Sequence, residues 1–359
     1  MRAAVFFCVD DRYFAVAATQ AVRALALTGP NVEVHVFVDG AGPDPSLVAK
    51  LERRGGGRLR VQVNKLLRHL PSDAPAGHTG SRIVYGRLFA ARYIDAERLL
   101  YLDVDIGLEG ALDIPFELDM RGAAIAAVPD LGLIYEAKRL AQIDDPFAVL
   151  PYFNAGVVVF DSARWLARDV DTSLRAWAAQ NPDERFADQA FLNAIEEGQW
   201  LPLSPRWNCQ GPLMQCGLAT AVVPRILHFT GWRPWDAPHL PIHLTHEEAF
   251  HRRATEAGFG PADFGHLQRR KRSRPLTAQL QRGLYACGLY TPKMRTRRDA
   301  FVDRLSFFRD YLRQAEERGF FADPFRLEPT PTIRPIFDGR QYYGVAGEIP
   351  CGVSQEART

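Results

Sequence analysis

Short apolar runs alternate with amphipathic stretches over the first 200 residues of the chain. The runs are rich in Val, Leu, Ile and Phe, as in strands that are buried on both faces of a sheet. They cover residues 3–9, 32–38, 59–63, 98–102, 123–128 and 155–160. Between them, apolar residues recur at three- and four-residue spacing. This spacing predicts helices over residues 13–27, 45–54, 82–94, 163–179 and 189–197.

This alternation of strand and helix patterns predicts an α/β fold. Strands that are separated by helices pair side by side in one direction, so we expect a mostly parallel sheet with helices on both faces. In such sheets, ligands bind beyond the carboxyl ends of the strands. Asp10 follows the first predicted strand and Asp103 follows the fourth. The sequence therefore predicts a ligand site at this edge of the sheet.

The pattern changes near residue 258. Thr245 and Glu248 have the spacing of a capping box, which predicts a helix from there toward residue 257. A Gly-Phe-Gly-Pro stretch from Gly258 then indicates a boundary. We predict one α/β domain over residues 1–258, followed by a basic, mostly helical extension over residues 259–359 with an irregular, proline-spaced tail.

Charge is balanced over the whole chain but not along it. The 359 residues are 47% apolar and 24% charged with a net charge of +2, which is ordinary for a globular protein. Residues 266–298, however, contain ten Lys and Arg and no Asp or Glu. Leu and Tyr side chains lie between these charges, so we expect peripheral contact with an anionic membrane. The alternative is a solvated basic face; no nucleic-acid motif accompanies the charges, and we expect no nucleic-acid partner.

Cysteine usage and the N-terminal run bear on location. The chain has five cysteines and no Cys-x-x-Cys pair, which favours a reducing compartment. The apolar run at residues 3–9 is too short for a signal peptide, and no stretch reaches the length of a membrane-spanning helix. We expect a cytoplasmic location, with peripheral contact on the inner face of the cell membrane.

Two carboxylates follow the apolar run at residues 98–102. Side chains two residues apart on a strand point to the same face, so Asp103 and Asp105 should converge. Carboxylates held close together repel each other unless positive charge lies between them. A divalent cation that prefers oxygen ligands, Mg²⁺ or Mn²⁺, would supply that charge. The alternative is a pair of turn aspartates that ends a strand.

The same Asp-Val-Asp tripeptide occurs a second time. Asp169 and Asp171 lie in the predicted helix over residues 163–179. Residues two apart on a helix do not face each other, so we predict a solvated surface there. The tripeptide alone is therefore a weak signal.

Several further strings appear in a fixed order. They are Val9-Asp10-Asp11, Asp103-x-Asp105, Tyr152-Phe153-Asn154-Ala155-Gly156, Asp188-Gln189, Pro205-Arg206-Trp207-Asn208 and His228-Phe229-Thr230-Gly231-Trp232-Arg233. In order and spacing they resemble glycosyltransferase family 8, a family that includes bacterial lipooligosaccharide galactosyltransferases and glycogenin. The resemblance covers about residues 1–260.

The resemblance implies a GT-A type nucleotide-binding fold over residues 1–258, a UDP-hexose donor and a Mn²⁺ or Mg²⁺ ion. Asp103, Asp105 and His228 would be the metal ligands. Without the resemblance, His228 would be interpreted as a buried core histidine. The implied donor-binding residues are Asp10, Arg12, Arg87, Asp103, Val104, Asn154, Ala155, Gly231 and Arg233. Arg12 stands where relatives commonly have Asn, and Arg233 where they often have Lys.

Asp188, Gln189 and Arg87 are the implied catalytic residues. The family retains anomeric configuration, either through a carboxylate nucleophile or through a same-face, one-step route, and the sequence does not choose between them. The alternatives are that Asp188 only caps a helix and that Arg87 is a surface arginine.

The resemblance thus implies a retaining, metal-dependent hexosyltransferase. It would move galactose or glucose from a UDP-sugar to a saccharide or glycolipid acceptor, such as a lipopolysaccharide precursor. Variable loops over residues 131–150 and 210–218 would contact the acceptor. Two rivals are a sugar nucleotidyltransferase and a catalytically inactive glycan-binding or scaffold protein. The first lacks the expected glycine-rich loop after the first strand, and the second would have no need of three intact metal ligands.

Overall fold

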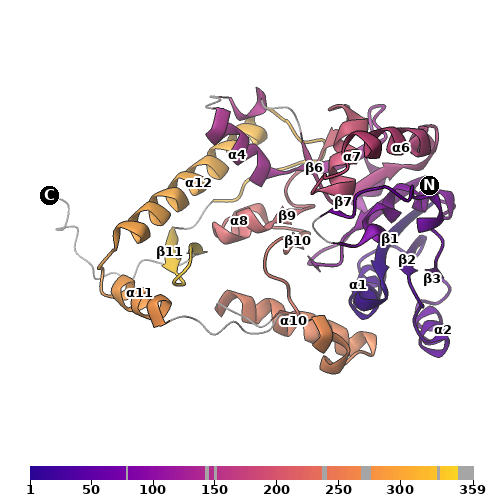
Figure 1. Ribbon diagram of the computed structural model, residues 1–359, viewed down its shortest axis with the longest axis horizontal. Helices are drawn as coiled ribbons and strands as arrows, with labels where there is room; N and C mark the ends of the chain where they lie inside the picture. The colour runs from indigo at the N-terminus through magenta and orange to yellow at the C-terminus, as the bar shows by residue number, and fades with distance from the viewer. Residues whose placement is uncertain are drawn as a thin grey trace.

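A seven-stranded sheet forms the centre of the described part of the chain. The computed structural model describes residues 1–77, 80–141, 145–148, 152–236, 241–267, 276–329 and 332–346. Within them, the sheet has the order β3-β2-β1-β4-β7-β6-β8 (Figure 1). Its strands are β1 Ala3–Asp10, β2 Val32–Asp39, β3 Leu59–Val63, β4 Arg98–Leu102, β6 Ile125–Pro129, β7 Phe153–Asp161 and β8 Leu201–Pro202.

Most neighbouring strands of this sheet are parallel. β3, β2, β1 and β4 run in one direction, and β8 is parallel to β6. β7 is antiparallel to both β4 and β6. The prediction of an α/β fold with a mostly parallel sheet is therefore confirmed. The antiparallel strand is the part that the alternating pattern did not predict.

Helices cover both faces of the sheet, and β1 shows why. Val5, Phe7 and Val9 pack in a core with α1 (Phe14–Ala26) and α10 (Pro241–Ala257). Phe6 and Cys8 point to the opposite face, into a second core. That core also contains side chains of the 3₁₀ helix η4 (Arg82–Leu88) and of α7 (Ala187–Glu196). Burial of apolar side chains on both faces holds the strand in place.

A small second sheet brings distant parts of the chain together. β10 (Ile226–His228) pairs antiparallel with β5 (Ile106–Leu108) and parallel with β9 (Cys209–Gln210). In this register, His228 lies opposite Ile106. The end of β10 is thereby placed beside the loop that follows β4.

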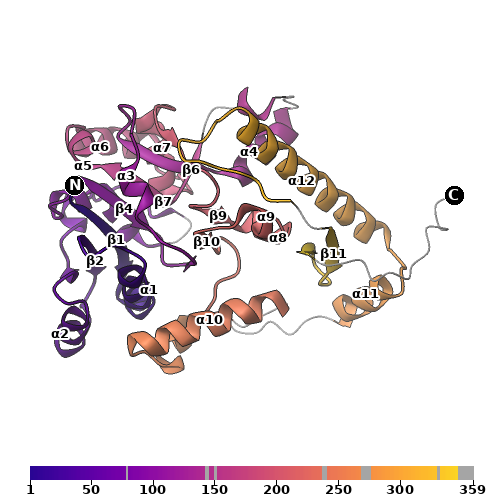
Figure 2. The ribbon, with the colours of Figure 1, turned by 180° about the vertical axis from the view of Figure 1, so that it is seen from behind.

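Residues after 275 form a third core together with earlier parts of the chain. α12 (Pro292–Glu317) runs beside α4 (Leu131–Ala141) in both ribbon views (Figures 1 and 2). Side chains of α12, of α4 and of residues 209–229 share this core. It also includes β11 (Ile333–Phe337) and β12 (Tyr342–Ala346), an antiparallel pair. Strand β11 occupies part of the tail that we expected to be irregular, and the domain boundary near residue 258 stays a prediction.

The buried carboxylate of Asp323 connects the C-terminal segment to the loop that contains Ser204 and Trp207. Asp323 is 5% exposed and accepts hydrogen bonds from the backbone N–H of Ser204 (2.7 Å) and its hydroxyl (2.6 Å). It also accepts one from the indole N–H of Trp207 (3.0 Å). The loop just before Asn208 is therefore fixed from the C-terminal side.

Two predicted helices differ in detail from those in the structure. The segment predicted as a helix over residues 82–94 is two 3₁₀ helices, η4 and η5 (Ala90–Arg92), because three-residue spacing fits either helix type. The segment over residues 163–179 is divided into α5 (Ser162–Leu166) and α6 (Val170–Gln180), with Asp161 and Asp169 as side-chain caps. These caps interrupt the helix without disturbing the apolar spacing.

The predicted capping box at Thr245 is wrong. The helix α10 begins at Pro241, and Thr245 lies inside it. Proline suits the first turn of a helix because its missing N–H would have no partner there. The remaining elements are η1 Asp11–Tyr13, α2 Pro45–Arg54, η2 Leu67–His69, α3 Ile114–Glu117, η6 Pro146–Ala148, α8 Gly211–Gln215, α9 Ala219–Val222, η7 Pro261–Leu267 and α11 Leu276–Ala286.

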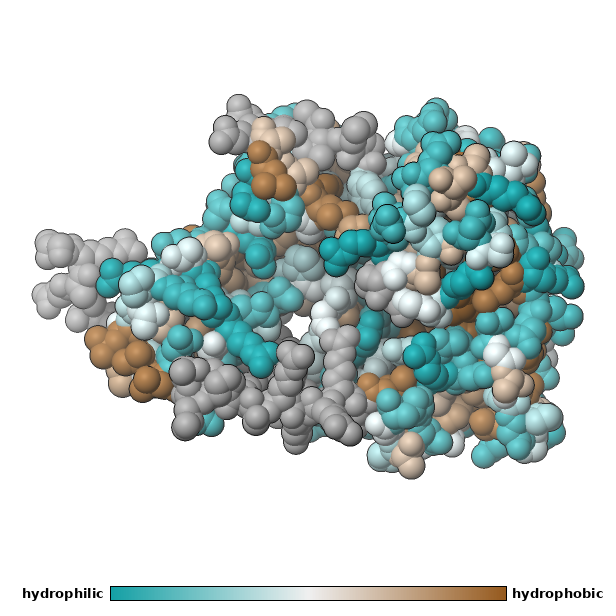
Figure 3. Space-filling model, viewed as in Figure 1, coloured by the Kyte–Doolittle hydropathy of each residue, from teal (hydrophilic) through white to brown (hydrophobic). Residues whose placement is uncertain are grey.

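The basic segment over residues 266–298 is only partly covered by the structure. Arg269, Arg270, Lys271, Arg272 and Arg274 lie outside the described residues. In Figure 3, apolar side chains on the face shown form small separate groups within a largely hydrophilic surface. None of the helices in the described ranges is both long enough and apolar enough to cross a membrane.

Candidate active site

A cavity of about 790 Å³ opens at the carboxyl ends of β1 and β4. Parallel α/β sheets bind ligands at this edge because several strand ends and their loops meet there. The cavity is large enough for a ligand of drug size or more. Its lining includes the predicted site residues Asp10, Arg12, Arg87, Asp103, Val104, Asp105, Asn154, Ala155, Asp188, Gln189, His228 and Arg233. Gly231, although described, is not part of the lining.

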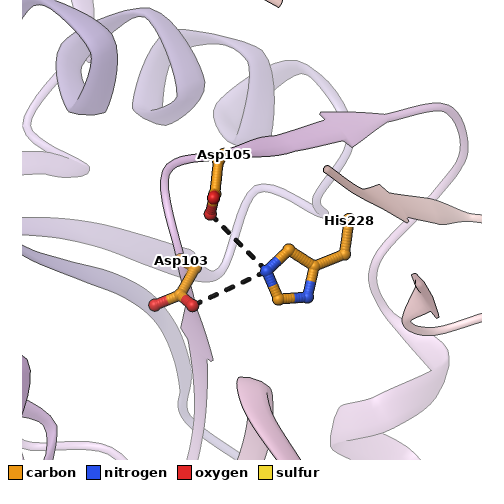
Figure 4. Close-up of side chains that lie close together, drawn as sticks. All are labelled: Asp103, Asp105 and His228. Atoms are coloured by element: carbon orange, nitrogen blue, oxygen red, sulfur yellow. Dashed lines mark ion pairs between the residues drawn. The ribbon is translucent and has the colours of Figure 1, made fainter. Parts of the chain in front are cut away.

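Asp103, Asp105 and His228 come together at one point (Figure 4). One ligand atom from each lies within 4.8 Å of the others. The imidazole Nε2 is 3.7 Å from Asp103 Oδ2 and 3.5 Å from Asp105 Oδ1. Two carboxylates and one imidazole form a donor set that a divalent cation can bind.

The orientation of His228 is fixed from behind. Its Nδ1 lies 3.0 Å from Oδ1 of Asn208, which is fully buried. Asn208 in turn donates to the side-chain oxygen of Asn154 (2.9 Å). An amide oxygen accepts from the protonated Nδ1, which leaves Nε2 to face the carboxylates. This is the tautomer that a metal ligand requires.

Glycine at position 156 makes room for this cluster. A Cβ atom there would lie 2.2 Å from Cε1 of His228 and 2.9 Å from Oδ2 of Asp103. The backbone N–H of Asp103 also donates to the Gly156 carbonyl (2.8 Å). Strand β7 thus forms a close wall behind two of the three predicted ligands.

Arg87 is buried between two carboxylates. Its side chain is 4% exposed, 3.1 Å from Asp103 Oδ1 through Nη2 and 2.9 Å from Asp188 Oδ2 through Nε. Its guanidinium carbon lies 3.9 Å from the ring centroid of Tyr101. Arg87 also donates to the carbonyl of Ala155. The alternative of a surface arginine is wrong, because tertiary packing buries the side chain.

Asp188 lies in the first turn of α7 and is not its cap. The cap position is Phe186, which makes no side-chain capping bond. Ala187, just before Asp188, has a φ of 46°, a conformation that costs energy for a residue with a side chain. Burial raises the pKa of Asp188 to about 6; the Arg87 guanidinium opposes this, while the Asp103 charge adds to it. The residue is therefore held deep in the cavity wall beside Arg87.

Gln189 and Asn154 share Asp130 as a partner. Gln189 accepts from the backbone N–H of Ala155 (3.0 Å) and donates to Asp130 Oδ2 (3.4 Å). Asn154 donates to the same carboxylate oxygen (3.3 Å). These bonds fix the side chains that line the middle of the cavity.

Two further arginines of the cavity lining are each paired with an aspartate. Arg233 Nε is 3.2 Å from Asp105 Oδ2, and Arg12 Nη2 is 2.7 Å from Asp10 Oδ2. Burial opposes ionisation of Asp105, but contact with His228 and Arg233 outweighs it and lowers the pKa of Asp105 to about 2. Asp105 is therefore ionised at neutral pH, as a metal ligand must be.

Sequence reasoning missed three residues of this site. Tyr101 donates to Asp103 Oδ1 (2.6 Å), Asn208 contacts His228, and Asp130 accepts from Gln189. Tyr101 lies in β4 and stands only two residues before Asp103, and this short spacing was a usable signal. Asn208 ends the string Pro205-Arg206-Trp207-Asn208, which resembles the family, but neither periodicity nor spacing assigns it a role. Asp130 directly follows the end of β6, as Asp103 follows the end of β4.

Comparisons with known proteins identify the family of this chain. A family model described as "Glycosyl transferase family 8" matches residues 4–238. "Glycosyltransferase GlyF" of Streptococcus pneumoniae serotype 4 is 26% identical over 250 residues, which are 66% of this chain and 58% of that protein. "Lipopolysaccharide 1,2-glucosyltransferase" of Escherichia coli K12 is 29% identical over 164 residues, 45% of this chain and 48% of that protein. The chain thus spans about half the length of these two relatives.

A solved structure shares the fold. The galactosyltransferase LgtC, in complex with donor and acceptor sugar analogs, superposes with a TM-score of 0.58 at 21% sequence identity. The match covers 74% of this chain and 99% of that one. The fold of the matched part is therefore that of a GT-A glycosyltransferase.

Proposed function

The chain belongs to glycosyltransferase family 8, and from this premise we propose that it is a retaining, metal-dependent hexosyltransferase. It would transfer galactose or glucose from a UDP-sugar to a saccharide or glycolipid acceptor. One observation carries the proposal: Asp103, Asp105 and His228 converge within 4.8 Å inside a cavity at the carboxyl ends of the strands.

The residues at this point fit a divalent cation. Two carboxylates and an imidazole whose Nδ1 is already engaged offer three ligand atoms, as Mn²⁺ accepts, and Mg²⁺ is the alternative. When bound, the ion would act as a Lewis acid that neutralises charge on the departing diphosphate. Arg233, held by Asp105, would add a positive charge to the same diphosphate.

The catalytic roles that we propose follow from burial and contacts. Arg87 would hold Asp103 and Asp188 at a fixed separation, since it contacts both. With a pKa near 6, Asp188 is mostly ionised at neutral pH and could serve as a nucleophile or stabilise an oxocarbenium ion. Gln189, held by Ala155 and Asp130, would face the sugar in the one-step route.

The activities after which two relatives are named support the choice of sugar and acceptor. The relative from Escherichia coli is named a lipopolysaccharide 1,2-glucosyltransferase, and the solved structure LgtC is a galactosyltransferase. We therefore propose a glucose or galactose donor and a cell-surface saccharide precursor as acceptor.

Calorimetry with UDP, with and without Mn²⁺, tests the proposal. We expect UDP to bind at least tenfold more tightly with the ion, because the diphosphate and the carboxylates repel each other without it. Asp103→Asn should lose this metal dependence, and Asp169→Asn, from the second tripeptide, is the matched control. Absent or metal-independent UDP binding by the unaltered protein would overturn the proposal.

A cytoplasmic location and contact with the inner face of the membrane remain part of the proposal. The supporting observation is the basic composition of residues 266–298. Sedimentation with anionic and with neutral liposomes at low salt is the test. Binding to the anionic vesicles alone is expected, and equal or absent binding would refute it.

A further inference from the structure

The end of the cavity that lies away from the predicted metal ligands is closed by the C-terminal region. Arg304 and Phe308, both on α12, line the cavity together with Tyr135 and Glu136 of α4. α12 lies beyond residue 238, where the match to the family model ends. α4 belongs to the stretch over residues 131–150 that we expect to contact the acceptor. The α12 part of this wall therefore lies outside the residues that match the family model.

The arginines that line the cavity are paired with carboxylates, with one exception. Arg12 is paired with Asp10, Arg87 with Asp103 and Asp188, and Arg233 with Asp105. Asp130 accepts neutral donors only, and Glu136 is paired with Arg139 outside the lining. Among the described residues, the lining arginine without a carboxylate within ion-pair distance is Arg304.

An aromatic ring lies beside Arg304. Its guanidinium carbon lies 5.6 Å from the ring centroid of Tyr135. The Tyr135 hydroxyl donates to Asp303 on α12 (2.8 Å), and the Tyr135 and Phe308 ring centroids are 6.0 Å apart. Arg304 is half-buried, so its charge is less screened than that of a surface arginine. A half-buried guanidinium beside an aromatic ring is a suitable partner for an anion.

We propose that Arg304 binds a negatively charged group on the acceptor, so that the enzyme takes a saccharide that carries a phosphate or a carboxylate. This inference rests on the proposed function and names its acceptor class. The guanidinium would pair with the anionic oxygens, while Tyr135 and Phe308, which are buried, form the packed wall behind it. No covalent step involves Arg304, which acts as a binding and specificity residue.

Binding of three matched probes tests the proposal. The probes are methyl glucoside, its 6-phosphate and the corresponding methyl glucuronide, which differ only at C6, the carbon outside the ring. Each is titrated into protein that is already saturated with UDP and Mn²⁺, so that the donor site is occupied. We expect at least one anionic probe to bind about tenfold or more tightly than the neutral one, as is typical of charge-assisted hydrogen bonds. The preferred anionic probe distinguishes phosphate from carboxylate.

Variants separate Arg304 from the general positive charge of α12. Arg304→Gln should lose the preference for the anionic probe about tenfold and change binding of the neutral probe less than twofold. Arg304→Lys should retain part of the preference. Arg298→Gln is the matched control, because Arg298 lies on the same helix over the ring of Tyr290 (5.5 Å) but does not line the cavity.

The outcomes keep the two proposals apart. If the unaltered protein binds UDP with Mn²⁺ but all three probes bind equally, the acceptor inference is overturned and the proposed function stands. If Arg304→Gln and Arg298→Gln lower the preference equally, the charge of the helix is responsible and Arg304 has no special role. If UDP with Mn²⁺ does not bind at all, the proposed function itself fails.

Discussion

The chain contains the tripeptide Asp-Val-Asp twice, and the two copies have different surroundings. Asp103 and Asp105 follow a buried strand and both point toward His228 (Figure 4). Asp169 caps α6 by accepting from the backbone N–H of Thr172 (3.1 Å), and Asp171 forms an ion pair with Arg92. Identical residues thus form a candidate metal site in one place and a helix start in the other.

The difference lies in what each pair meets. Asp103 and Asp105 lie in the short loop between β4 and β5, and β10, which pairs with β5, brings an imidazole from a distant part of the chain to them. At the beginning of α6, the two carboxylates serve separate partners, and within the described ranges they join no group of potential metal ligands. A motif of three residues therefore gains its meaning from the backbone that carries it and from a third, distant ligand.

Matched substitutions in the two copies should give the largest contrast. Asp103→Asn should lower UDP release from UDP-galactose or UDP-glucose in the presence of Mn²⁺ by about a thousandfold, because it removes a ligand that supports charge neutralisation. Asp169→Asn should leave the rate within about twofold, because asparagine also caps helices well. Equal losses in both variants would mean that the first tripeptide is not a metal site.

The pH dependence of folding stability should report the burial of Asp188, which Arg87 links to Asp103 of the first copy. Its pKa is raised from an ordinary value near 3.8 to about 6, so the folded protein holds this proton more tightly than the unfolded chain does. Ionisation therefore costs folding stability as pH rises through this window, by on the order of 3 kcal/mol once pH exceeds 6. Below about pH 4 the cost is absent.

Asp188→Asn should remove this cost. In urea unfolding with chelator present, the stability of the variant relative to the unaltered protein should rise between pH 4 and pH 7. Asp171→Asn is the control from the second copy. The Arg92 contact lowers the pKa of Asp171, so this variant should show no such rise. A constant difference between the Asp188→Asn variant and the unaltered protein would show that Asp188 is not destabilised by burial.

Asn208→Ala should weaken metal binding at the first copy by about tenfold or more, because His228 loses the partner that orients its ring. Asn208→Asp, which keeps an acceptor for Nδ1, should restore much of the affinity. Mn²⁺ titration in the presence of UDP is the measurement. Unchanged affinity in Asn208→Ala would mean that strand pairing alone orients the imidazole.

The smallest effect is expected at the second copy. Asp169→Ala should lower the free energy of unfolding by about 1 kcal/mol, since the first turn of α6 loses its cap, and should leave UDP release unchanged. Chemical denaturation of the two proteins measures the difference. A loss of activity without a loss of stability would contradict the structural role that we assign to this copy.

Local patterns in the sequence predicted most of the sheet, because each buried strand has its own apolar run. The site was predicted only in part. Asp103 and Asp105 were found because they follow an apolar run, although they lie in the loop after β4 and not on the strand. His228 needed the family resemblance because a distant ligand leaves no local signal. Arg87 could be interpreted as a surface residue because its burial depends on Tyr101 and Asp188, which are separated from it in the chain. Capping residues likewise divided a predicted helix without changing its apolar spacing.

The hydrogen bonds of Asp323 have a consequence for the order in which the protein is completed. Ser204 and Asp323 are 119 positions apart, and Asp323 leaves the ribosome after every residue of the candidate metal site. During synthesis, Ser204 and Trp207 therefore emerge before the carboxylate of Asp323 that accepts their hydrogen bonds. We expect the imidazole to reach its final orientation only when synthesis of the chain is nearly finished. A nascent chain that ends before Asp323 would carry all three ligands without the anchor that holds their support.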